Sequence, residues 1–197
     1  MGLLILGALD LSAQGAAPCP PVLASLMPKG AVNVTGQFTS AGIVGMGFAA
    51  ADLPFDHPCT KSDKYPGRIV VDVQHYQGEG VKLFKMQVDS VEKQTLENER
   101  EEMERRRPDI RKTSTLDKIS DVKTETVPGG TLLYYDYYTD CSEEGIKRSH
   151  PSVRLLGVAH TDSTKINIQI DGFISAEVAR AAALEVIANF GKADFGK

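Results

Sequence analysis

Three residues that could bind a metal or carry out redox chemistry lie within four positions of one another: Asp56, His57 and Cys59. Carboxylate, imidazole and thiolate groups are all metal ligands by type. No second group of ligands follows at a recognised spacing, so the sequence favours a rigid loop that carries a disulfide cysteine. A hydrolase or redox enzyme that uses His57 and Cys59 is therefore the weakest functional hypothesis.

Other catalytic patterns are missing from the sequence. None of the motifs G-x-S-x-G, H-E-x-x-H or C-x-x-C occurs, and His75, His150 and His160 are scattered along the chain. We therefore predict no catalytic residue, no metal site and no cofactor, and enzymatic activity has no support from the sequence.

Four of the six tyrosines fall in one short segment that also contains an aspartate: Tyr134, Tyr135, Asp136, Tyr137 and Tyr138. If this segment is a strand, Tyr134, Asp136 and Tyr138 share one face, and Tyr135 and Tyr137 share the other. Tyrosine combines a large apolar area with a polar tip, so such a face suits a protein partner or a flat ligand. Ordinary cross-strand packing of aromatic side chains is the favoured structural explanation.

The first residues suggest where the protein works. An apolar run from Gly2 to Leu11 precedes Ala13 and Gly15, which is the layout of a secretory signal and its cleavage site. Asp10 interrupts the run and no basic residue precedes Lys29, so a buried structural segment is the alternative. We expect residues 1–18 to be this leader, residues 19–197 to form one domain, and the protein to be exported, either periplasmic or extracellular.

The three cysteines are Cys19, Cys59 and Cys141. In an oxidising compartment one disulfide would form and leave one thiol over. Pairing of Cys19 with Cys59 is the first expectation and pairing of Cys59 with Cys141 is the second, whereas a reducing compartment would leave three unconnected thiols.

Composition excludes two broad classes of protein. The 197 residues include 22 basic and 26 acidic side chains, a formal charge of −4 that gives no footprint for nucleic acid. With 42% hydrophobic and 24% charged residues, the chain is neither disordered nor embedded in a membrane. We expect one globular domain without a transmembrane segment.

Residues 41–48 are apolar without a clear period, and we interpret them as a buried strand. Further along the chain, hydrophobic periodicity predicts a hairpin followed by a helix. Residues 68–76 alternate as a strand, the glycines that follow make a turn, and residues 81–88 are expected to return as a second strand. Residues 89–107 then form a long charged helix that should stop at Pro108. Its last turn carries Arg105, Arg106 and Arg107, for which a solvated face is the favoured interpretation and a docking edge for an acidic partner the other.

The second half contains the clearest local pattern. Residues 131–139 read as a strand, and residues 153–161 and 164–171 as a half-buried antiparallel hairpin. Ser175 can cap a helix that runs to Phe190 with one apolar face toward the sheet.

Together these elements predict an α+β fold, in which a mostly antiparallel sheet of about five or six strands is packed by the charged helix and by the C-terminal amphipathic helix. The hairpin and closing helix between Ser152 and Phe190 resemble exported domains of the PsbP and Mog1 type. That resemblance implies an accessory or binding role without catalytic residues. We therefore expect a noncatalytic protein that binds a partner or belongs to a larger assembly; a small-ligand carrier that uses the tyrosine-rich face is the alternative.

Overall fold

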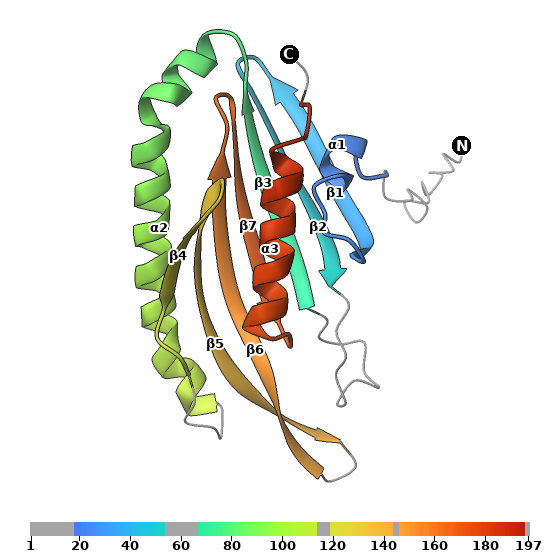
Figure 1. The fold of residues 1–197 in the computed structure, drawn as a ribbon, viewed down its shortest axis with the longest axis vertical. Helices are drawn as coiled ribbons and strands as arrows, with labels where there is room; N and C mark the ends of the chain where they lie inside the picture. The colour runs from blue at the N-terminus through green and yellow to red at the C-terminus, as the bar shows by residue number, and fades with distance from the viewer. Residues whose placement is uncertain (1–17, 54–66, 114–118, 144–145, 196–197) are drawn as a thin grey trace, which may run out of the picture.

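The computed structural model describes residues 18–53, 67–113, 119–143 and 146–195, apart from the side chains of 108–113 and 139–148. Within these residues the strands form one antiparallel sheet of seven (Figure 1). In chain order the strands are β1 (Val32–Ala41), β2 (Val44–Leu53), β3 (Gly67–Tyr76), β4 (Lys123–Val127), β5 (Gly130–Glu143), β6 (Ile146–His160) and β7 (Thr164–Gly172).

The sheet order is β1-β2-β3-β7-β6-β5-β4, and every neighbouring pair is antiparallel. The predicted α+β class with an antiparallel sheet is confirmed, although the sheet has seven strands rather than five or six. One strand is expected at residues 41–48, but residues 32–53 form the hairpin of β1 and β2, and the short edge strand β4 is a further addition. Gly42, with φ +62°, turns the chain between β1 and β2 in a conformation that glycine adopts readily.

Helix α2 (Glu79–Thr113) corrects two expectations from the sequence. The segment 81–88 is not a strand, because the helix begins directly after the turn at Gly78. Phe84 and Val88 are buried and four residues apart, whereas Met86 between them is 83% exposed, which is a helical and not an alternating pattern. The helix also continues through Pro108, since the loss of one backbone donor near its end leaves the other helical hydrogen bonds in place.

The two remaining helices are α1 (Pro21–Ala24) and α3 (Ala176–Phe190). The Ser175 hydroxyl accepts a hydrogen bond from the Val178 backbone N–H and caps α3, as its residue type predicts. The side chains that α3 buries are Ala179, Ala182, Ala183, Val186, Ile187 and Phe190.

Each face of the sheet has its own apolar core. On one face α1 and α3 cover a cluster that includes Ile166, Ile168 and Ile170, all fully buried. On the other face α2 packs on a smaller cluster, which consists of Met103, Ile119, Val122, Leu133, Tyr135, Leu156 and Val158. No helix in the described part of the chain is both long and apolar enough to span a membrane.

Candidate functional site

A groove of 430 Å³ lies between α2 and the face of the sheet that α2 covers. Its walls combine one helix with three strands, because α2, β4, β5 and β6 all contribute side chains. The lining residues are Asp89, Glu92, Lys93, Leu96, Glu97, Arg100, Thr124, Leu133 and His160.

Helical spacing explains how α2 builds its wall. Asp89, Lys93, Leu96 and Arg100 follow one another at intervals of three or four residues, so they share one flank of the helix. Leu96 faces Leu133 of β5, which is only 1% exposed and belongs to the core beneath α2. Leu96 and Leu133 thus form an apolar floor among the charged side chains of α2 that line the groove.

One end of the groove is acidic. The Nε2 atom of His160 lies 3.4 Å from the carboxylate of Glu92 and 3.8 Å from that of Asp89. The Thr131 hydroxyl also donates a hydrogen bond to Glu92, at 3.4 Å. These contacts fix the carboxylate of Glu92, so this end offers acceptor atoms to a ligand.

Arg100 lies toward the other end of the α2 wall. The guanidinium of Arg100 donates a hydrogen bond to the hydroxyl of Thr124 on β4. Lys93 lies on the same helix flank, with its Nζ atom 3.9 Å from Glu97. Carboxylates and cations therefore alternate along the α2 wall, since Lys93 follows Glu92 directly and Glu97 precedes Arg100 by three residues.

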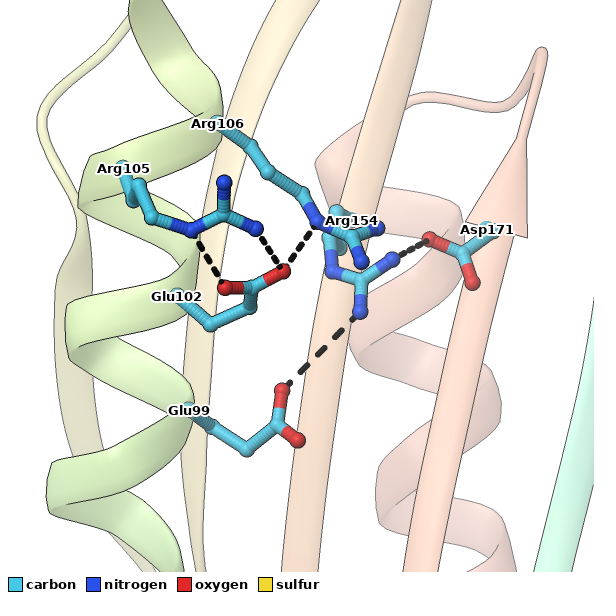
Figure 2. Close-up of polar contacts among 6 residues, drawn as sticks. All are labelled: Glu99, Glu102, Arg105, Arg106, Arg154 and Asp171. Atoms are coloured by element: carbon cyan, nitrogen blue, oxygen red, sulfur yellow. Dashed lines mark hydrogen bonds and ion pairs between the residues drawn. The ribbon is translucent and has the colours of Figure 1, made fainter.

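Further charged groups lie between α2 and the sheet, toward the C-terminal end of the helix (Figure 2). Arg154 of β6 pairs with Asp171 of β7 at 3.3 Å and approaches Glu99 of α2 at 3.9 Å. On α2 itself, hydrogen bonds from Arg105 and Arg106 lower the pKa of Glu102 to about 2 (Figure 2). Arg105 and Arg106 are thus paired within the helix, whereas the contact between Arg154 and Glu99 joins the helix to the strands.

Lys165 of β7 is a buried cation beside the acidic end, and only 5% of it is exposed. Its Nζ atom lies 3.2 Å from the hydroxyl of Thr95 on α2. Burial lowers the pKa of Lys165, and the negative charge of Glu92 offsets part of that effect. A half-buried hairpin predicts that the face opposite the isoleucines is solvated, but α2 covers this face at Lys165.

The tyrosine-rich segment forms part of β5, and its alternation is as predicted. Tyr135 and Tyr137 point toward the α2 side, where Tyr135 is 1% exposed. Tyr134 and Asp136 point to the opposite side, and Lys123 of β4 contacts both of them. Burial acts to raise the pKa of Asp136, but hydrogen bonds from Ser120 and Lys123 outweigh it and lower the value.

The five predicted residues therefore divide between two faces and do not form one surface. Tyr138 is the most exposed of them, at 38%. Whether any of the five contacts a partner remains a prediction.

Tyr137 provides a test of this arrangement through its ionisation. Burial raises the pKa of Tyr137 to about 12, and the neighbouring Tyr135 adds to the effect. Because the native pKa lies above the unfolded value of about 10, the native state holds this proton more tightly, and the resulting stability is lost as pH rises from about 10 through about 12. Across that window the unfolding free energy of the wild type should fall by about 2 kcal/mol relative to Tyr137→Phe.

Urea unfolding curves at several alkaline pH values measure this difference. Tyr138→Phe, on the same strand, is the matched control and should keep the slope of the wild type. An identical pH slope for the wild type and Tyr137→Phe would contradict the buried position of this phenol.

Of the three cysteine side chains, the structure describes that of Cys19. Cys19 has no disulfide partner among the described residues; its Sγ lies against Gly36 of β1, and burial raises its pKa. Cys59 lies outside the described residues together with Asp56 and His57, and the side chain of Cys141 is not described either. The expected disulfides stay predictions, and so does the expected leader, since residues 1–17 also lie outside the described part.

Sequence reasoning did not find the groove. The signal on α2 was available, because residues 89, 92, 93, 96, 97 and 100 recur at helical intervals. Their strand partners could not be found, since Thr124, Leu133 and His160 have no shared motif and meet only through the sheet order.

Comparisons with protein-family models, with curated proteins and with solved structures find no match for this chain. Within the described residues, no group of three or more His, Cys, Asp and Glu side chains is arranged to hold a metal ion. The geometry of the groove is therefore the main basis for a functional proposal.

Proposed function

We propose that this protein is a noncatalytic, exported binding or accessory protein, and that the groove beside α2 is its binding site. The observation that carries the proposal is the groove itself, with an apolar floor at Leu96 and Leu133 and charged side chains of both signs around it. Pockets that bind ligands are typically apolar with a few polar groups that fix orientation. The leader-like sequence at the N-terminus supports the exported location.

The lining chemistry also favours recognition. The imidazole of His160 lies within ion-pair distance of Glu92, and the hydroxyl of Thr124 accepts a hydrogen bond from Arg100. In both pairs one group orients the other, and neither pair places a base beside a nucleophile. Groups held in this way suit the orientation of a bound molecule.

A small-ligand carrier is the second candidate, favoured by the size of the groove. Its 430 Å³ lies within the range of about 300 to 1,000 Å³ that small-molecule sites occupy. In this form the ligand would contact Leu133 of β5 rather than the tyrosines of the same strand.

Filling the groove tests the proposal. Thr124→Trp places a large side chain beside Arg100, whereas Thr126→Trp adds the same side chain two residues further along β4, outside the lining. The wild type and both variants are isolated from the protein's own cells and examined by native mass spectrometry. We expect an added noncovalent mass on the wild type and on Thr126→Trp that Thr124→Trp loses.

Two results would count against the proposal. Equal added mass on all three proteins would place the binding site elsewhere. Turnover of a substrate that a single substitution in the groove abolishes, such as His160→Gln, would replace a binding protein with an enzyme.

A further inference from the structure

Arg100 is the groove cation that the described residues leave without a carboxylate partner. It is partly buried, and its one polar contact among those residues is the hydroxyl of Thr124. Five other described arginines have carboxylate partners: Arg105 and Arg106 pair with Glu102, Arg107 with Glu104 and Asp121, Arg154 with Asp171, and Arg180 with Glu125. The charge of Arg100 is thus available to a ligand.

The chemistry of a guanidinium specifies what such a ligand carries. Its planar fork of N–H donors matches the two oxygens of a carboxylate, and the pairing strengthens where water is partly excluded. Leu96 precedes Arg100 by about one helical turn, and Leu133 lies on the floor of the same groove. A molecule held by Arg100 therefore places an apolar part over these leucines.

The far end of the groove favours a donor. Glu92 and Asp89 present carboxylates there, and the lone pairs that their contacts with Thr131 and His160 leave unused can accept a hydrogen bond from a ligand. Glu92 and Arg100 are eight residues apart on α2, a rise of about 12 Å. An ammonium group or another donor at about that distance from the carboxylate would contact both ends at once.

We infer that the groove binds an amphipathic carboxylate, held at its acid group by Arg100, with an apolar middle and a donor group toward Glu92. The inference rests on the proposed function, because it names the ligand class of the same groove. A free small acid and an acidic side chain on an extended segment of a partner protein both supply this chemistry.

Isothermal titration with defined probes tests the inference. The probes are 8-aminooctanoate, octanoate, octylamine and the peptide acetyl-Lys-Thr-Leu-Thr-Glu-amide. We expect 8-aminooctanoate to bind more tightly than octanoate, and octanoate more tightly than octylamine, which lacks the carboxylate. Tighter binding of aminooctanoate than of the peptide would indicate a free acid, and the reverse order a partner's side chain; both support the inference.

Variants of the arginine separate a specific anchor from a general charge effect. Arg100→Gln should weaken the best probe by about tenfold or more, and Arg100→Lys should restore part of the affinity. Arg105→Gln removes a charge from the same helix outside the groove and should stay within about twofold of the wild type. Folding of each variant is checked by its circular dichroism and unfolding midpoint.

Three results would overturn the inference: no probe binding to the wild type, octylamine binding as tightly as 8-aminooctanoate, or an unchanged affinity in Arg100→Gln. The proposed function can be tested separately from this inference, by native mass spectrometry of the variants. If a co-purifying mass is lost from Thr124→Trp but retained by Arg100→Gln, the groove is still the binding site, and only the carboxylate anchor is wrong.

Discussion

Replacement of Phe84 by alanine is expected to lower the free energy of unfolding by about 3 kcal/mol. Phe84 is 6% exposed and fixes the first turns of α2 on the sheet. Its ring stacks on Tyr76 of β3 at a centroid distance of 4.5 Å and meets the edge of His160 at 6.5 Å. Alanine removes these aromatic contacts and leaves a cavity at the N-terminal end of the helix. Urea denaturation of the wild type and the variant measures the loss.

Met86→Ala is the control for this prediction. Met86 is 83% exposed and two residues from Phe84, so its truncation should change stability by less than about 0.5 kcal/mol. If residues 81–88 were a strand, Phe84 and Met86 would share one face and both truncations would expose similar surroundings. Equal losses for the two variants would therefore contradict the helix.

This region also shows why the sequence predicted a strand where the structure has a helix. The stripe that α2 turns toward the sheet begins with Phe84 and Val88 but continues through Glu92 and Glu99 before Met103. The glutamates of this stripe interrupt the helical period of apolar residues. The short apolar segment 81–88 therefore resembles a strand when it is considered by itself. Those glutamates face strand residues such as His160 and Arg154, which no local pattern identifies.

Where the structure has the hairpin of β1 and β2, the sequence predicts only one buried strand, at residues 41–48, and the reason is different. Its inward positions on β2 include Gly45 and Gly47, and Phe38 of β1 covers both of them. A Cβ atom on Gly45 would lie 2.6 Å from the Phe38 ring, so the small residue is required by its cross-strand neighbour. Alternation of large apolar residues, the usual strand signal, is therefore absent although the strand is regular.

By contrast, β7 was predictable because local and tertiary requirements agree. Ile166, Ile168 and Ile170 alternate in the sequence, and all three are fully buried under α3. The edge strand β4 lacked that agreement, since Val127 is the buried residue among its five. The position of a strand in the sheet decides how many of its side chains are buried. It therefore also decides how clearly apolar and polar residues alternate in its sequence.

The candidate site was less predictable than the fold. The tyrosines of β5 can be identified from the sequence because four of them lie in one short segment, whereas no motif or unusual composition marks Arg100 or Thr124. Their importance comes from the diagonal course of α2 over β6, β5 and β4, which leaves a groove along one flank of the helix. A binding role can be proposed for residues on a helix flank only when the strand residues opposite them are known.

Replacement of Tyr135 by alanine is expected to destabilise the protein by about 3 to 4 kcal/mol. Its ring is 1% exposed and fills the cluster under α2, with Met103 and Leu133 among its members. Removal of a buried aromatic ring loses its transfer free energy and leaves a cavity, because the surrounding side chains relax only partly. Thermal and urea unfolding both measure the effect.

Tyr138→Ala on the same strand is the matched control. Tyr138 is 38% exposed, so its truncation should cost less than about 1 kcal/mol. Were the tyrosines of β5 mainly a contact surface, both variants would be nearly as stable as the wild type and would lose a partner instead. A large loss confined to Tyr135→Ala would assign this tyrosine to the interior, and it would leave the groove along α2 as the better place to look for a ligand.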